Sequence, residues 1–104
     1  MQYGLTQGMS EKISNGYARF PEVEKVVLYG SRANGNYKNG SDIDFTLYGT
    51  ALTPDLRANI AMALDDLMLP YTIDLSFFDE LENAELREHI KRVGKVFYEK
   101  TNQN

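Results

Sequence analysis

The sequence predicts an α/β (α+β) fold in which a small mixed β-sheet has helices packed on one face. Apolar residues recur at helical spacing in three segments, and short β-rich apolar runs lie between these segments. The expected order is helix, strand, strand, helix, strand, helix and a last short strand, which is typical of a layered sandwich. The chain has 104 residues, and we expect one domain covering 1–104 because two domains need a longer chain.

The first helix is expected between Thr6 and Arg19. Apolar residues recur there every three or four positions, so they share one face of a helix. Gly8 and Gly16 weaken this helix, because glycine has low helix propensity. Pro21 separates the segment from the strand that follows.

Two short strands are expected on either side of a polar loop. Lys25 to Tyr29 is an apolar, β-rich run that ends at Gly30, and Ile43 to Tyr48 has a similar composition. Glycine and asparagine fill the loop between them, as in turns. This loop is too short for a full crossover helix but has room for one helical turn beginning near Ser31.

A second helix is expected from Pro54 to Met68. Thr53 is suited to be its N-cap, with proline at the first helical position and Asp55 in the first turn. Asp65 and Asp66 come near its C-terminus, where negative charge is unfavourable, and we expect them to be solvated surface residues.

The remaining chain is expected to supply a strand, a helix and a short last strand. Polar and apolar residues alternate over Tyr71 to Phe77, which is the clearest strand pattern in the chain. Asp79 and Glu82 have the spacing of a capping box for the third helix. Gly94 is expected to end that helix, and Val96 to Tyr98 to form the last strand.

The overall composition excludes several classes of protein. The net charge of -4 argues against a nucleic-acid binder, which usually has a basic face. No run of about 18 apolar residues is present, so we expect no membrane span, and the N-terminus does not resemble a signal peptide. The sequence has no cysteine and one histidine, which argues against a structural zinc site. We expect a cytoplasmic protein.

Three aspartates have the chemistry and placement of metal ligands. Asp42 and Asp44 are two residues apart on a predicted strand, so their side chains leave the same face with Cα atoms about 7 Å apart. Two carboxylates held about 4 Å apart repel by roughly 4 kcal/mol, and protonation, basic partners or bound cations relieve this repulsion. Oxygen ligands favour Mg²⁺, or Mn²⁺, over zinc. Asp74 lies on the polar face of its own strand. If that strand pairs beside Ile43 to Tyr48, Asp74 could bind one metal and accept a proton from an attacking hydroxyl.

A second group of residues is suited to bind phosphate. Gly30 allows a sharp turn and a close approach by a phosphate group. Ser31 would open a short helical turn, where a hydroxyl and free N–H groups can contact phosphate oxygens. Arg32 adds a guanidinium that could contact phosphate or pair with a nearby carboxylate, and both roles stay open.

These two groups together resemble a known signature. Gly30 and Ser31, followed after ten residues by Asp42-x-Asp44, are similar to the motif of the DNA polymerase β-like nucleotidyltransferases, and the wider context resembles the minimal nucleotidyltransferases of prokaryotes. The resemblance implies a palm-like nucleotidyltransferase fold, two Mg²⁺ ions and a nucleoside triphosphate donor. It implies phosphate binding by Gly30 and Ser31, and metal binding by Asp42, Asp44 and a third carboxylate matching Asp74. Many relatives have a basic residue where this chain has Asn34.

The resemblance also implies a partner. Family members of this size often pair with an all-helical protein of the HEPN type in toxin–antitoxin systems and add AMP to it. A Mg²⁺-dependent transfer of AMP from ATP to such a protein, in an antitoxin role, is therefore the leading hypothesis. The alternatives are a non-catalytic module that binds and neutralises a helical partner, or transfer to a small molecule. The acceptor, the preferred base and homo-oligomer formation stay open.

Overall fold

The structure is a computed structural model that describes residues 3–35 and 42–100. Four strands form one mixed sheet in the order β3-β2-β1-β4. β1 runs antiparallel to both of its neighbours, whereas β2 and β3 run parallel. The loop predicted before the second strand (36–41) and the end of the polar tail (101–104) lie outside the described residues. The elements are α1 (Gln7–Ala18), β1 (Lys25–Tyr29), α2 (Ser31–Asn34), β2 (Ile43–Tyr48), α3 (Pro54–Asp65), β3 (Ile73–Phe77), the 3₁₀ helix η1 (Phe78–Glu80), α4 (Ala84–Val93) and β4 (Lys95–Glu99).

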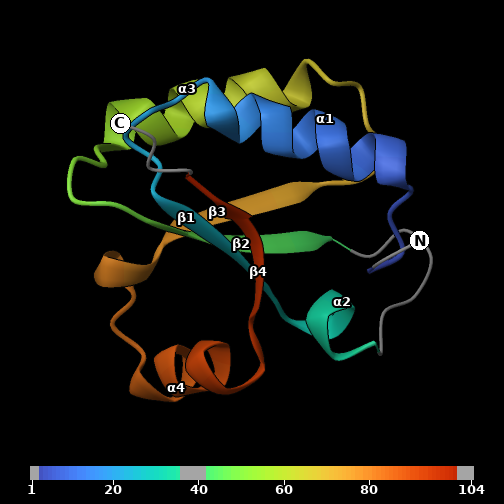
Figure 1. Cartoon of the computed structure of the whole chain (residues 1–104). Coiled ribbons are helices and arrows are strands. Elements are labelled where there is room, and N and C mark those ends of the chain that lie inside the picture. Colours follow the sequence, from blue (N-terminus) through green and yellow to red (C-terminus); the bar gives the residue numbers. More distant parts are fainter. Residues whose placement is uncertain (1–2, 36–41, 101–104) are drawn as a thin grey trace.

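The main core lies between one face of the sheet and the helices α1 and α3. These two helices lie side by side across that face (Figure 1), as the sequence predicts. Alternate residues of the two central strands point into this layer and are fully buried, so the strand pattern of the sequence is realised. The fully buried residues of this core include Leu5, Ile13, Tyr17, Val23, Val26, Leu28, Ile43, Phe45, Leu47 and Ile60.

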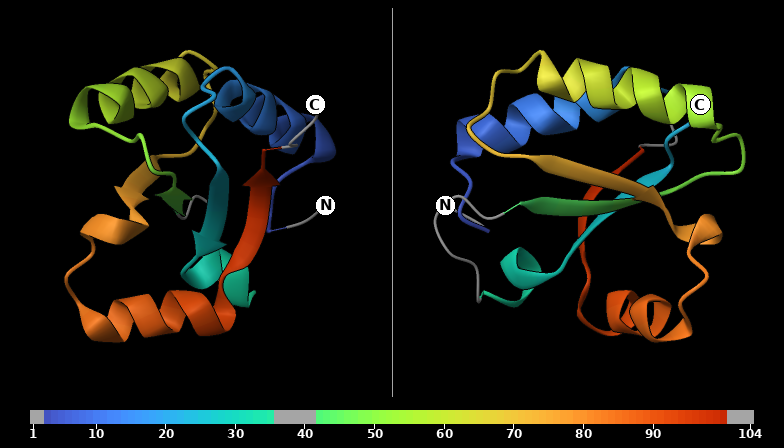
Figure 2. Two further views of the ribbon diagram at one scale, coloured as in Figure 1. Left: turned by 60° about the vertical axis from the view of Figure 1, so that its left-hand side comes forward. Right: turned by 180° about the vertical axis from the view of Figure 1, so that it is seen from behind.

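The last helix covers the other face, which differs from the prediction that helices pack on one face only. α4 lies on the opposite side of the sheet from α1 and α3 (Figure 2). Alternation along β1 sends Val27 to this second face, where it forms a small cluster with Phe78 and Ile90. Since β1 is apolar on both faces, its second face also needs a cover, and α4 supplies it.

Two predicted helix ends, the start of α3 and the end of α4, are found in the structure, and the other two differ. The Thr53 hydroxyl accepts a hydrogen bond from the Leu56 amide at 3.1 Å, as expected for an N-cap. α3 ends at Asp65, three residues before the predicted end, and Met68 has a left-handed φ of 57°. α4 begins after a different cap from the predicted one, because Asn83 Oδ1 accepts from the Leu86 amide at 3.0 Å.

The predicted Asp79–Glu82 capping box is therefore wrong. Asp79 lies within η1, a turn that directly follows β3, and the helix starts later than the acidic spacing indicates. The last strand is present and Gly94 is the C-cap of α4, as predicted. Within the described ranges, no helix is long and apolar enough to cross a membrane.

Candidate active site

The pairing of β2 with β3 brings two of the predicted aspartates to neighbouring positions. Asp44 and Asp74 are direct partners in the parallel register of these strands. Both alternate with apolar residues that face the main core, so their side chains leave the opposite face of the sheet. Asp42 is exposed and immediately precedes β2. The two motifs that supply these residues are about 30 positions apart in the sequence, and the sheet joins them.

Asp74 and Asp42 lie near enough to Asp44 for their charges to act on its carboxylate. The pKa of Asp44 is raised above its ordinary value of 3.8, first by burial and then by the negative charges of Asp74 and Asp42. A carboxylate that is both partly desolvated and close to two like charges is a favourable place for a cation. The structure therefore brings the three predicted metal ligands into one electronegative patch, which we call the carboxylate site.

The donors of the carboxylate site suit a hard cation such as Mg²⁺, because they are all carboxylate oxygens. Among the residues that the structure describes, no group of three histidine, cysteine, aspartate or glutamate side chains is already arranged to hold a metal.

Gly30 lies directly against the carboxylate site. It follows Tyr29, which pairs with Asp44 across β1 and β2. Its backbone has φ 79° and ψ -156°, a conformation that disfavours any other residue. A Cβ atom at this position would lie 2.6 Å from Oδ2 of Asp44. The absence of a side chain therefore allows the turn and the carboxylate to touch, and the predicted phosphate and metal groups form one site.

Ser31 opens the short helix α2, as the sequence predicts. Gly30 is the N-cap, and its carbonyl accepts a hydrogen bond from the Asn34 amide at 3.3 Å. Ser31 is exposed. Ser31 directly follows Gly30, the residue that lies against Asp44.

Arg32 is buried and contacts a backbone carbonyl and an aromatic ring, and neither contact is one of its two predicted roles. Its side chain is only 2% exposed. Nη1 donates a hydrogen bond to the Tyr3 carbonyl at 2.7 Å, and the guanidinium lies 4.6 Å from the centre of the Tyr71 ring. Arg32 thus fastens α2 to the N-terminal segment and to the chain before β3. The contact of Arg32 with phosphate stays a prediction.

Two polar residues of the carboxylate site were not among the sequence candidates. Tyr29 is half-buried, and burial raises the pKa of its hydroxyl, a hydrogen bond with the Ser76 side chain lowers it, and the charges of Asp44 and Asp74 raise it. Ser76 follows Asp74 by two residues on the same face of β3. Strand alternation was the signal that could have found both residues.

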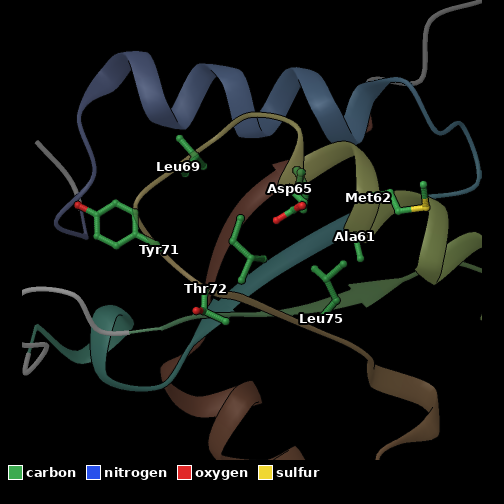
Figure 3. Close-up of a pocket in the computed structure, with 9 residues that line it drawn as sticks. Ala61, Met62, Asp65, Leu69, Tyr71, Thr72 and Leu75 are labelled. Carbon is green, nitrogen blue, oxygen red and sulfur yellow. The ribbon is translucent and has the colours of Figure 1, made fainter.

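A separate cavity lies on the other side of the sheet. It has a volume of about 430 Å³ and lies between α3 and β3 (Figure 3). Ile73 and Leu75 line it, and they alternate with Asp74 along the strand. The cavity is therefore an opening at the edge of the main core, and it is distinct from the carboxylate site.

Comparison with protein families shows which family this chain belongs to. Residues 11–103 match the family model described as polymerase beta, nucleotidyltransferase. Since this match covers most of the chain, the protein belongs to the polymerase β nucleotidyltransferase family, and the predicted resemblance is confirmed. No curated protein matches the chain significantly.

Solved structures share the same fold at low sequence identity. A toxin–antitoxin structure with AMP-PNP has a TM-score of 0.68 and 21% identity over 92% of this chain and 75% of that one. The structure of the toxin–antitoxin MntA-HepT has a TM-score of 0.66 and 20% identity, and the match covers 91% of this chain and 74% of that one. A third structure is a complex of a tri-AMPylated Shewanella oneidensis HEPN toxin with an MNT antitoxin. Its TM-score is 0.67 at 19% identity, and the match covers 92% of this chain and 74% of that one. These similarities establish the fold.

Proposed function

We propose that this protein is a Mg²⁺-dependent nucleotidyltransferase that moves AMP from ATP to a protein acceptor of the HEPN type, as the antitoxin of a toxin–antitoxin pair. The observation that carries the proposal is the contact between Gly30 and Asp44 beside the Asp44–Asp74 register pair. Nucleotidyl transfer needs a backbone turn that can bind phosphate and, beside it, carboxylates that can bind a metal ion. Family membership supports nucleotidyl transfer as the reaction.

Each residue of the carboxylate site has a role in this proposal. Asp42, Asp44 and Asp74 would hold Mg²⁺, or Mn²⁺ in its place, and Gly30 with Ser31 would contact the phosphates. When bound, Mg²⁺ supplies charge neutralisation on the phosphates and a template for in-line displacement.

The transfer itself would proceed in one displacement. The acceptor hydroxyl oxygen forms a bond to the α-phosphorus, the bond from that phosphorus to the bridging oxygen breaks, and pyrophosphate leaves. Asp74 accepts the hydroxyl proton. Arg32 would hold α2, and with it Ser31, in place, and its guanidinium would add positive charge beside the phosphates.

Relatives of similar fold support the choice of donor and acceptor. One is a toxin–antitoxin structure with AMP-PNP, and another contains an AMPylated HEPN toxin with an MNT antitoxin. This chain aligns over about nine-tenths of its length with both. We carry their acceptor class and nucleotide to this protein as part of the proposal.

The test is transfer of label from ATP to a HEPN-type protein, the proposed acceptor. With Mg²⁺ and α-labelled ATP, the wild type is expected to label that protein, and Asp42→Asn to reduce the rate at least about 100-fold. Asp66→Asn is the matched control, because Asp66 is an exposed aspartate at the end of α3. If the partner binds tightly, remains unlabelled and binds Asp44→Ala equally well, the non-catalytic binding module is the correct function.

A further inference from the structure

The segment that enters β3 contacts both halves of the candidate site. Thr72 directly precedes β3, and its carbonyl accepts a hydrogen bond from the Ile43 amide at 2.9 Å. Ile43 lies between Asp42 and Asp44, so this bond fixes the entry of β3 beside the two aspartates. The preceding residue, Tyr71, contacts the other half of the site, where phosphate binding is proposed.

The Tyr71 ring lies against the guanidinium of Arg32. The Arg32 Cζ atom is 4.6 Å from the ring centre, which is within the range of a cation–π contact. Figure 3 shows the Tyr71 ring extending away from Ala61 and Leu75, which line the other end of the cavity. Because the Arg32 side chain is only 2% exposed, water competes little with this contact, and the attraction is stronger than at an exposed site.

Through Arg32, this contact acts on the phosphate turn, by which we mean Gly30 and the helix α2. α2 is a single turn of four residues, and so short a helix depends on tertiary contacts for its stability. Arg32 supplies two of them, at the Tyr71 ring and at the Tyr3 carbonyl, which is 2.7 Å from Nη1. Since Ser31 directly precedes Arg32, the contacts that fix Arg32 also fix the place of Ser31 relative to the entry of β3.

We propose that Tyr71 is a positioning residue for the nucleotide: its ring holds Arg32, and through Arg32 the phosphate turn, in a fixed place relative to Asp44 and Asp74. This inference rests on the proposed function, because it assigns the phosphates of a nucleoside triphosphate to that turn. A site whose two halves are aligned before the ligand arrives loses less freedom on binding. Tyr71 therefore raises the affinity for the nucleotide without being a ligand of the metal.

The experiment measures the affinity of the full chain for two probes, ATP with Mg²⁺ by calorimetry and Mn²⁺ alone by electron paramagnetic resonance. Tyr71→Leu removes the ring and keeps an apolar side chain. It is expected to raise the Kd for ATP about fivefold to twentyfold and to change the Kd for Mn²⁺ by less than about twofold. Tyr71→Phe keeps the face of the ring and is expected to match the wild type with both probes. Tyr71→Met is the second ring-free variant, with the same expected results should Tyr71→Leu fail to fold.

A double-variant cycle tests whether Tyr71 acts through Arg32. Arg32→Met removes the charge and keeps a long side chain, and in this background Tyr71→Leu is expected to raise the Kd for ATP by less than about twofold. Tyr48→Leu is the matched control, because Lys25 Nζ lies 4.4 Å from the centre of the Tyr48 ring, at the end of β2 away from Asp44. It is expected to leave both Kd values unchanged. Thermal midpoints verify that each variant is folded.

The results distinguish failure of the inference from failure of the proposed function. If the wild type binds ATP, Asp44→Asn binds it more weakly and Tyr71→Leu matches the wild type, the inference is wrong while the proposed function stands. An equal loss from Tyr71→Leu with and without Arg32, or an equal loss for ATP and Mn²⁺, also overturns the positioning role. No binding of ATP by the wild type overturns the proposed function, and the inference with it.

Discussion

Gly30 is the residue at which the backbone and the chemistry of the site constrain each other most tightly. Its positive φ disfavours any side chain, and a Cβ atom would also displace the Asp44 carboxylate. The sequence predicted a turn with room for phosphate at this position. It could not predict the contact with Asp44, because that contact depends on the pairing of two strands separated by a loop.

Replacing Gly30 by alanine is expected to lower kcat/KM for AMP transfer at least about 100-fold, since a displacement of roughly 1 Å in a reacting group has that effect. Gly35→Ala is the control, because Gly35 has a φ of 78° but no atom within 4 Å of an added Cβ. Both variants carry backbone strain, and only Gly30→Ala disturbs Asp44. Steady-state kinetics in which the two variants lose activity equally would contradict the role of this contact.

Asp44 is expected to destabilise the free protein at neutral pH. Its folded pKa is raised, so the folded state binds its proton more tightly than the unfolded state does. The stability associated with this group is therefore complete below the unfolded pKa, near 3.8, and is lost as the pH rises through the higher folded pKa.

Asp44→Asn is accordingly expected to raise the free energy of unfolding at pH 7 by at most about 1 kcal/mol, because the carboxylate is partly solvated. The gain should disappear at about pH 2.5, well below the unfolded pKa, where the Asp44 carboxyl is protonated in both states. Urea denaturation at the two pH values measures the difference. A variant that is less stable than the wild type at pH 7 would contradict the assigned electrostatics.

At the scale of elements, local patterns predicted strands well and helix starts less well. The alternation over β3 and the apolar run of β1 were sufficient to predict these strands, because both patterns are local properties of the sequence. The start of α4 was misplaced because two acidic residues matched a capping box, although Asn83 forms the actual cap. Asp79 and Asn83 are only four residues apart, and both residue types are suited to be N-caps. Asp79 lies within the turn η1 that follows β3, so Asn83 is the N-cap of α4.

The junction between α4 and β4 provides a test at this scale. A Cβ atom on Gly94 would lie 2.4 Å from the Ile90 carbonyl oxygen and 2.6 Å from Cγ1 of Val27. Gly94→Ala is therefore expected to lower the free energy of unfolding by about 1–3 kcal/mol, as overpacking does. Gly8→Ala, at an open helical position, should instead stabilise by up to about 1 kcal/mol. Urea denaturation measures both changes, and equal effects would contradict the packing of α4 against β1.

At the scale of the whole molecule, the sequence predicted the mixed sheet but not the order of its strands. The order β3-β2-β1-β4 makes Asp44 and Asp74 neighbours. The sequence placed Asp74 on a polar face and could only assume that its strand lay beside β2. It also left the second face of the sheet uncovered, because the alternation of Val27 with the core residues of β1 was not used.

The central claim is that Asp44 and Asp74, from different strands, act with Gly30 as one metal-dependent site for nucleotidyl transfer. The most direct measurement compares α-labelled and γ-labelled ATP with the wild type and Asp74→Asn, with Mg²⁺ and in excess chelator. We expect label on the helical partner only from α-labelled ATP, only with Mg²⁺, and with at least about a 100-fold lower rate in Asp74→Asn. Transfer of the γ-label, transfer in chelator, or an unchanged rate in Asp74→Asn would contradict it.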